Sequence, residues 1–334
     1  MSRKEQDRIA VFHDHADCIG GGEKLAFTLA RSLNADVITT DLSRDSVKKM
    51  GFDDVKVIDI GSTIKIPPLK QISASVKFAS CDFSRDYGFF IMSGAWSIFA
   101  AKKHKPNLLY CHTPVRAFYD LYEDFMADRN IITRPVFSSY AALHSRQLQK
   151  ALGHVSRIVT NSRNVQDRIR KYHCRDSDII YPPIKQYRYR KNEDFWLSVN
   201  RLYPQKRIEL QIEAFRKMPD QRLVIVGDHA EGDHADKYAG RIAKNLPDNI
   251  EVRKRISEKE LEDLYADCIG LIATAQDEDF GMNVVEAMSA GKPVIATDEG
   301  GHRETMIDNI TGKLINPGPG DLINAIKAVS RNPG

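Results

Sequence analysis

The stretch EDFGMNVVEAMSAGKPVIATDEGG, residues 278–301, places two glutamates eight residues apart and follows them with an apolar run between glycines. The preceding run GLIATAQ predicts a buried strand, with the loop DEDFG at its carboxyl end. We expect a helix to start near Gly281 or Met282 and to end at Gly291, because glycine commonly terminates helices. The run KPVIATD predicts the next buried strand. A strand, a helix and a further strand in this order are typical of a parallel sheet.

Similar apolar runs, rich in Val and Ile, alternate with helical patterns along the whole chain. They are RIAVFH, ADVITTD, VKVIDI, YGFFIMSG, NLLYCHT, RIVTNS and DIIYPP in the first half, and FWLSVNR, RLVIVGD, IEVRKRI, GLIATA and KPVIATD in the second. Continuous apolar strands separated by helices indicate parallel sheets that are covered on both faces. These strands are too many for one compact sheet.

A break in the pattern falls at residues 181–195, where Pro182 and Pro183 stop a strand and a polar, charged segment follows. We therefore predict an α/β protein with two doubly wound parallel-sheet domains, residues 1–187 and 188–334. Ligands of such sheets bind at the carboxyl ends of the strands. With two facing domains, we expect the ligand in a deep cleft between them.

The composition fits a globular, cytoplasmic protein. Hydrophobic residues make up 42% of the 334 residues and charged residues 28%, and no apolar run reaches membrane-spanning length. The five cysteines are scattered, which argues against a disulfide framework or a zinc cage. Residues 1–187 carry 28 Lys and Arg against 20 Asp and Glu, and the remainder 21 against 25. This asymmetry indicates either different partners for the two halves or ordinary surface variation.

The loop and helix start inside residues 278–301 predict an anion site. The backbone N–H groups of Phe280, Gly281, Met282 and Asn283 are expected at a helix N-terminus, where they lack helical partners and suit a diphosphate. Carboxylates beside such a site would instead accept hydrogen bonds from hydroxyl groups. Glu278 in the loop and Glu286 in the helix therefore favour a diphosphate with a polyol on each side, which describes a nucleotide sugar.

A glycine turn follows the first predicted strand. Gly20, Gly21 and Gly22 precede an amphipathic helix, and backbone N–H groups in such a turn can approach an anion closely. A tight strand–helix connection without a ligand explains the same glycines. The turn matches neither G-x-G-x-x-G nor a P-loop, which disfavours a nicotinamide-dependent oxidoreductase.

Residues 278–286 resemble the glutamate-x7-glutamate motif of the family 4 (group 1) glycosyltransferases, which are retaining enzymes of the two-domain GT-B fold. The resemblance implies that Glu278 holds the donor sugar and Glu286 the nucleotide ribose. Other stretches are similar to family segments in the family's order: IGGGEKLAFTLA, YCHTPVRAFYD, VTNSRNVQDRI, IIYPPI and VNRLYPQKRIELQIEAF. YCHTPVRAFYD is most like the mannosyltransferases, which favours GDP-mannose as the donor over a UDP-sugar.

Arg201 and Lys206 follow the first predicted strand of the second domain. Two cations at a carboxyl edge would neutralise a diphosphate and stabilise it as a leaving group. The resemblance places them in the family's diphosphate clamp. It also implies that His112, at the end of NLLYCHT, contacts the donor sugar from the first domain. A lone histidine at a strand end is otherwise more often structural.

Three stretches contain residues that could hold a metal, although none of them is a clear metal motif. Asp277–Asp279 spells D-x-D within the two-glutamate motif, GDHAEGDHAD (227–236) combines histidines with carboxylates, and HDH (13–15) is equally ambiguous. The resemblance implies transfer without a metal or other cofactor. No interleaving of basic and aromatic residues indicates nucleic acid.

The stretch Ile64–Ser80 mixes lysines with apolar residues. It predicts either a peripheral contact with anionic lipid at the inner face of the cell membrane or an ordinary loop and helix. We expect the acceptor to be a glycan or a lipid-linked glycan. Many family members end with a helix that crosses back to the first domain, whereas this sequence stops at AIKAVSRNPG. That helix is either missing or truncated.

The resemblance thus implies a retaining glycosyltransferase in which the departing diphosphate takes the acceptor proton. A sugar-nucleotide epimerase and a non-catalytic binding protein remain as rivals. The epimerase would turn over without an acceptor, and the binding protein would not turn over at all.

Overall fold

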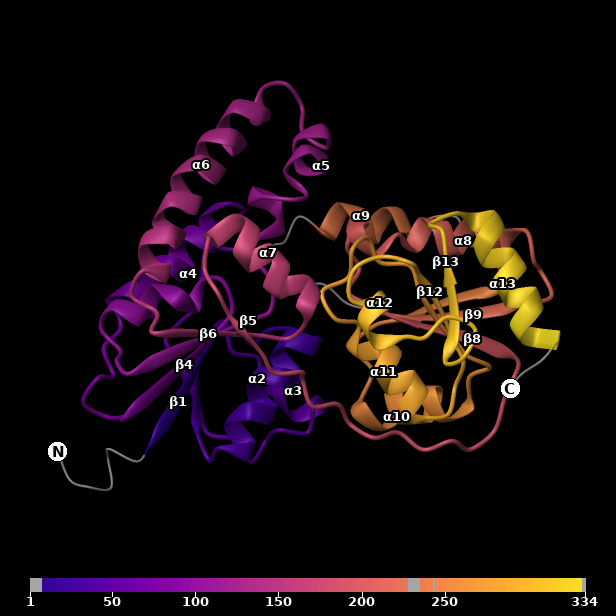
Figure 1. Ribbon diagram of the computed structural model, residues 1–334, viewed down its shortest axis with the longest axis horizontal. Helices are drawn as coiled ribbons and strands as arrows, with labels where there is room; N and C mark the ends of the chain where they lie inside the picture. Colours follow the sequence, from indigo (N-terminus) through magenta and orange to yellow (C-terminus); the bar gives the residue numbers. More distant parts are fainter. Residues whose placement is uncertain (1–7, 228–234, 243, 245, 332–334) are drawn as a thin grey trace. The chain divides into compact units, whose positions relative to one another are not determined.

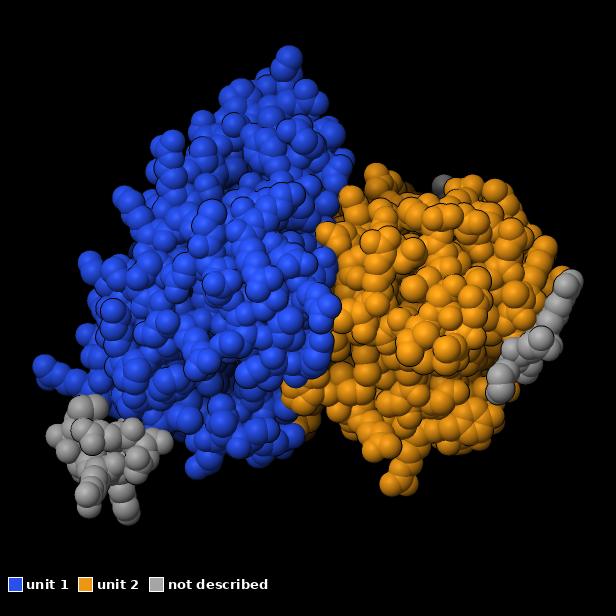
Figure 2. Space-filling model, in the orientation of Figure 1, with its two compact units in different colours: residues 1–17, 22–44, 52–181 blue, residues 18–21, 45–51, 182–334 orange. Residues whose placement is uncertain are grey.

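The computed structural model describes residues 8–227, 235–242, 244 and 246–331. The candidate metal-binding histidines His229 and His234 lie outside the described residues. The chain forms two compact units, one holding strands β1 to β7 and the other holding strands β8 to β13 (Figures 1 and 2).

The first unit contains a seven-stranded sheet in the order β3-β2-β1-β4-β5-β6-β7, and its paired strands are all parallel. The strands are β1 (Ile9–His15), β2 (Asp36–Thr40), β3 (Val57–Asp59), β4 (Phe89–Ser93), β5 (Asn107–Cys111), β6 (Arg157–Thr160) and β7 (Asp178–Ile179). The chain reverses its direction of winding between β1 and β4, which makes the sheet doubly wound.

The helices that connect these strands are α2 (Gly21–Ser32), α3 (Arg44–Lys49), α4 (Leu69–Ser80), α5 (Tyr122–Ala127), α6 (Thr133–Leu152) and α7 (Arg163–His173). The described residues also form three short 3-10 helices: η1 (Ser97–Lys102) and η2 (Arg116–Phe118) here, and η3 (Pro204–Lys206) in the second unit. Local sequence fixes α7 at both ends. The Ser162 hydroxyl accepts the Val165 N–H at 3.0 Å, and Cys174 takes the left-handed conformation that ends the helix.

The second unit contains a six-stranded parallel sheet in the order β10-β9-β8-β11-β12-β13. Its strands are β8 (Phe195–Val199), β9 (Arg222–Val226), β10 (Ile250–Arg253), β11 (Leu271–Ala273), β12 (Val294–Thr297) and β13 (Gly312–Ile315). Its helices are α8 (Ile208–Arg216), α9 (Ala235–Ile242), α10 (Glu258–Asp267), α11 (Met282–Ser289), α12 (His302–Thr305) and α13 (Pro319–Arg331). The winding reverses between β8 and β11.

Each sheet has its own apolar core. Phe12, Phe78 and Phe90 are fully buried in the first unit, and Trp196 and Phe215 are fully buried in the second. Burial of side chains of this size stabilises each unit by about 1.5–3 kcal/mol per residue. Separate cores explain why the chain forms two units.

The predicted α/β fold with two doubly wound parallel sheets is confirmed. All seven strands expected in the first half are present, and so are the five expected in the second. Strand β13 was not predicted. It begins with Gly312 and Lys313 and stands at the edge of the sheet beside β12, so it lacks the continuous apolar pattern of a central strand.

Candidate functional site

Two loops meet at the carboxyl edge of the second sheet. β8 leads into residues 200–207, and β11 leads into residues 274–281. β8 and β11 are neighbours, with Leu197 paired to Leu271. They flank the point where the winding reverses, which is where open α/β sheets bind ligands.

Lys206 and Glu278 form an ion pair between these loops. The Lys206 ammonium donates to Glu278 Oε2 at 2.5 Å, and both side chains are four-fifths or more buried. Backbone contacts hold the pair in place: the Thr274 hydroxyl donates to the Lys206 carbonyl at 2.8 Å, and the Gln276 N–H donates to the Gln205 carbonyl at 2.7 Å. Burial by itself would raise the pKa of Glu278, but the Lys206 charge outweighs it and holds the pKa well below its usual value.

The paired glycines at the end of the stretch 278–301 let two backbone segments touch. The Gly301 N–H donates to the Glu278 carbonyl at 2.7 Å. A Cβ on Gly300 would lie 2.5 Å from the Glu278 carbonyl oxygen, and a Cβ on Gly301 would lie 2.6 Å from the Phe280 Cα. Only glycine fits at these two positions, so the sequence Gly-Gly supports the loop that carries Glu278.

Helix α11 begins at Met282, directly after the Glu278 loop. Gly281 caps it with φ +90°, a left-handed conformation that favours glycine. The Asn283 side-chain amide donates to the Val199 carbonyl at 2.9 Å, which ties the helix start to the end of β8. Phe280 is buried beneath the turn. Met282 and Asn283 are therefore the first two residues of α11, at the helix start where the sequence predicts an anion site.

Glu286 lies in α11, more than one turn from its start, and is buried. Its Oε2 accepts a hydrogen bond from the Tyr265 hydroxyl at 2.8 Å. Burial, followed by the charge of Glu286, raises the pKa of Tyr265, so this hydroxyl remains a donor at all ordinary pH values. The contact fixes the direction in which the carboxylate points.

Arg201 is half-buried in the loop after β8, and its carbonyl accepts the Tyr203 N–H at 2.9 Å. Further along this loop, Arg207 pairs with Glu299 at 2.6 Å. Glu299 Oε2 also accepts the Asp277 N–H at 3.3 Å. Asp277, the first residue of the D-x-D triplet, thus belongs to the support of the Glu278 loop.

The sequence analysis missed His302, which is fully buried at the start of α12. Its Nδ1 lies 3.0 Å from the Thr297 carbonyl, and a Cβ on Gly281 would lie 3.2 Å from its ring. Burial lowers the pKa of His302, and the charge of Glu278 opposes that shift. His302 follows Gly300 and Gly301 directly, and this position after a glycine pair was the feature of the sequence that could have identified it.

In the first unit, His112 follows β5 and its Nε2 lies 2.8 Å from the Ser93 hydroxyl at the end of β4. Its carbonyl accepts the Asn161 amide at 3.1 Å. Gly22, in the first turn of α2, lies beside the same ring, since a Cβ there would be 3.9 Å from the His112 Cε1. The second candidate glycine, Gly21, is the first residue of α2.

Among the described residues, no helix combines the length and the apolar character needed to cross a membrane.

Comparisons with known proteins point to the glycosyltransferases. Residues 184–334 match the family model described as glycosyl transferases group 1. The chain is 27% identical over 282 residues to the alpha-1,3/1,6-mannosyltransferase ALG2 of Dictyostelium discoideum, which covers 72% of this chain and 66% of that protein. It is 28% identical over 212 residues to an uncharacterised glycosyltransferase of Methanocaldococcus jannaschii, covering 63% of this chain and 56% of that protein. The chain thus spans between about half and two thirds of these relatives.

Solved structures share the fold over nearly the whole chain. The Anabaena protein HepE, in complex with UDP and glucose, has a TM-score of 0.74 at 19% identity, with 97% of this chain and 90% of that chain covered. Sucrose-phosphate synthase from Thermosynechococcus elongatus has a TM-score of 0.71 at 18% identity, with 98% and 90% covered. The chain therefore has the two-domain GT-B fold, and its residues 184–334 match the model of the group 1 glycosyltransferases.

Proposed function

We propose that the chain is a retaining hexosyltransferase that moves mannose from GDP-mannose to a hydroxyl of a glycan or lipid-linked acceptor. The observation that carries this proposal is the buried Lys206–Glu278 pair beside the start of α11, inside a group 1 glycosyltransferase domain. The mannosyltransferase relatives support mannose as the sugar.

The donor would lie along the carboxyl edge of the second sheet. Its diphosphate would accept hydrogen bonds from the first-turn N–H groups of α11 and would be neutralised by Arg201 and Lys206. Glu278 would accept hydrogen bonds from the sugar hydroxyls, and Glu286 would accept them from the ribose. The two carboxylates then lie on either side of the phosphates without opposing their charge directly.

The chemistry would proceed on one face of the sugar. The bond between the anomeric carbon and the diphosphate oxygen breaks, the acceptor oxygen bonds to that carbon on the same face, and its proton passes to the departing diphosphate. Arg201, Lys206 and the start of α11 would stabilise the growing negative charge, so the step needs no metal at the diphosphate. The contact of His112 with the donor sugar stays a prediction.

A UDP-sugar is the second candidate donor. HepE, which shares the fold, was solved with UDP and glucose. Lys206 and Glu278 are proposed to hold the diphosphate and the sugar and not the base, so the same residues would serve either donor. The choice between donors is therefore a question for a binding measurement.

The first experiment measures thermal stabilisation of the full chain by GDP, UDP, ADP, GDP-mannose and UDP-glucose, with and without EDTA. A ligand at a hundred times its dissociation constant adds about 2.7 kcal/mol to the free energy of unfolding. We expect a GDP-selective shift that persists in EDTA and is lost in Lys206→Ala. The matched control is Lys217→Ala, which removes an exposed Lys–Glu pair with a similar N–O distance of 3.0 Å.

The absence of a shift with any nucleotide would contradict the proposal and favour a non-catalytic protein. A shift that is accompanied by conversion of the donor sugar without an acceptor would favour the epimerase.

We further propose that the first unit meets a membrane through residues 64–80. Large apolar side chains are exposed there: Ile64, Ile66, Leu69, Ile72 and Val76. The lysines are less available than the sequence predicted, because Lys65 pairs with Asp41 at 2.9 Å and Lys70 is buried. Apolar insertion rather than attraction to anionic lipid would then drive the contact.

Cosedimentation with vesicles of neutral and anionic lipid tests this surface. We expect binding to both lipids with a weak dependence on salt, and a loss of binding in Ile66→Asp and Val76→Asp. The matched control is Ile310→Asp, an exposed isoleucine in the second unit. Unchanged binding in the two α4-region variants would contradict the proposal.

A further inference from the structure

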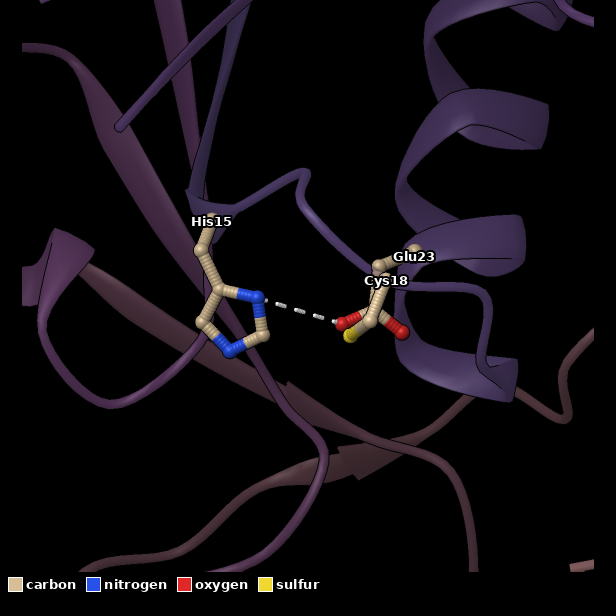
Figure 3. A group of neighbouring side chains, drawn as sticks. All are labelled: His15, Cys18 and Glu23. Carbon is tan, nitrogen blue, oxygen red and sulfur yellow. Dashed lines mark ion pairs between the residues drawn. The ribbon is translucent and has the colours of Figure 1, made fainter. Parts of the chain in front are cut away.

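A cluster of histidine, cysteine and carboxylate side chains lies between the end of β1 and the first turn of α2 (Figure 3). One ligand atom each from His15, Cys18 and Glu23 lies within 4.8 Å of the others. Figure 3 shows the three side chains turned toward one another, with the Nδ1 of His15 facing the Glu23 carboxylate at 3.6 Å. Cys18 and Glu23 are buried, while the His15 side chain keeps 20% exposure and offers a way in from solvent.

A second histidine points into this cluster. The Nδ1 of His13 lies 2.7 Å from the Ser93 carbonyl, and because a carbonyl only accepts, Nδ1 carries the hydrogen. The Nε2 of His13 therefore presents a lone pair. It is buried, has no hydrogen-bond partner among the described residues, and lies 3.9 Å from the Glu23 carboxylate. Two electron-rich atoms that face each other in a buried place indicate that a cation belongs between them.

The charges fit a divalent metal ion. A thiolate from Cys18 and a carboxylate from Glu23 supply two negative charges, and two neutral imidazoles add none, so a divalent cation makes the set neutral. The neighbouring Asp17 carboxylate is already balanced by Lys65 at 3.2 Å and Lys70 at 3.6 Å. Asp17 Oδ1 also lies 3.1 Å from the His15 Nδ1 and accepts the hydrogen on that atom, which an ion bound at Nδ1 would replace.

The spacing also fits. Zinc bonds of about 2.0–2.3 Å in a tetrahedron separate neighbouring ligand atoms by roughly 3.3–3.7 Å. The distance of 3.6 Å from Glu23 to His15 falls in this range, whereas the His13 Nε2, at 3.9 Å from Glu23, lies outside the set of three atoms within 4.8 Å of one another and would have to move toward the ion. Thiolate, imidazole and carboxylate together are a ligand set that zinc prefers.

We propose that His13, His15, Cys18 and Glu23 bind one Zn²⁺ ion and thereby fix the glycine turn between β1 and α2. The ion joins the last residues of the strand to the first turn of the helix, so Gly20–Gly22 are held from both ends. The role is structural, and it is separate from the transfer step in the second unit.

Cobalt(II) provides a test that does not depend on activity, because a cobalt–thiolate bond gives a charge-transfer absorption in the near ultraviolet. We expect the full chain to bind one Co²⁺ with this absorption and to lose it on addition of Zn²⁺. Cys18→Ser should abolish the band, and Cys174→Ser, which removes the exposed cysteine, should leave it unchanged. Binding through His229 and His234 involves no thiolate and does not produce the band.

Cys18→Ser could lose the band by unfolding, so a second variant, His15→Asn, is needed. The His15 side chain is partly exposed, so its replacement should disturb the fold less. We expect it to weaken Zn²⁺ binding by more than tenfold while circular dichroism stays unchanged. The proposal is overturned if the native chain gives no thiolate band, or if the band survives in Cys18→Ser.

Discussion

At the carboxyl edge of the second sheet, Lys206 and Glu278 form an ion pair beside the start of α11, whereas at the end of β1 in the first sheet two histidines face Glu23. Both sheets are doubly wound and parallel, and in each unit a helix with glycine at its start follows a strand. The topology therefore fixes where a site lies, and the residues at the strand ends decide its chemistry. A lysine and a carboxylate suit a diphosphate and a sugar, and the histidine cluster suits a metal.

Removal of Lys206 should give the largest effect in this comparison. Lys206→Ala takes away a charge that would stabilise the leaving diphosphate and leaves Glu278 buried without its partner, so we expect kcat to fall by about 10²–10³. Single-turnover transfer with GDP-mannose measures the loss. Lys217→Ala should change it little, and a drop of less than threefold in Lys206→Ala would contradict the proposed role.

Variants of Glu286 and Tyr265 distinguish a residue proposed to contact the nucleotide from a residue that only orients it. Glu286→Gln removes the charge proposed to bind the ribose, and we expect nucleotide affinity to fall by about 10–100-fold, as for other charged hydrogen bonds. Tyr265→Phe keeps the carboxylate and removes only its orienting donor, so its effect on affinity should be smaller. Calorimetric titration with GDP measures both, and equal losses would mean that Glu286 acts only through its contact with Tyr265.

The glycines of the two units should respond differently to a methyl group. Gly301→Ala places a Cβ 2.6 Å from the Phe280 Cα, so we expect the free energy of unfolding to fall by about 1–3 kcal/mol. Gly22→Ala meets its nearest atom at 3.9 Å within a helix and should leave stability unchanged or slightly higher. Urea denaturation monitored by tryptophan fluorescence tests the pair. A similar loss in both variants would show that the close approach at Gly301 is relaxed at little cost.

The pH dependence of stability tests the charge of Glu278 itself. Burial alone would raise the pKa of Glu278, but Lys206 lowers it from 4.5 to about 2 in the folded state. A depressed carboxyl pKa stabilises the fold above pH 4.5, and this contribution is lost as the pH falls from 4.5 toward 2.

Urea midpoints between pH 3 and pH 6 for the native chain and for Glu278→Gln measure this contribution. The difference between the two proteins should shrink as the pH falls, because the variant has no carboxyl group to protonate at that position. A difference that stays constant with pH would mean that Glu278 titrates normally.

Most of the fold was predictable because buried parallel strands are continuous apolar runs, as in RLVIVGD and KPVIATD. Strand β13 was not predicted, because an edge strand that begins with Gly312 and Lys313 lacks that pattern. The stretch 278–301 predicted the start of α11 and its end before Gly291, since glycine marks both places. The sequence also identified Lys206 and Glu278 as candidate site residues, although it could not show that they form an ion pair.

Other features depended on contacts between residues far apart in the chain. His302 lies beside Gly281 only because Gly300 and Gly301 let their backbone approach the Glu278 loop. The cluster of His15, Cys18 and Glu23 forms because one turn of helix brings Glu23 back toward the end of β1. The spacings of three residues from His15 to Cys18 and five from Cys18 to Glu23 match no recognised metal motif. The scattered cysteines also argued against a metal site.

The Lys206–Glu278 pair also bears on turnover. In the proposed reaction, Lys206 would exchange its carboxylate partner for the donor diphosphate, and the released Glu278 would become available to the sugar. After transfer the sugar would be gone, and Glu278 would compete with the nucleoside diphosphate for Lys206. The proposed site therefore predicts that Glu278 weakens the binding of the nucleoside diphosphate product more than the binding of the intact donor.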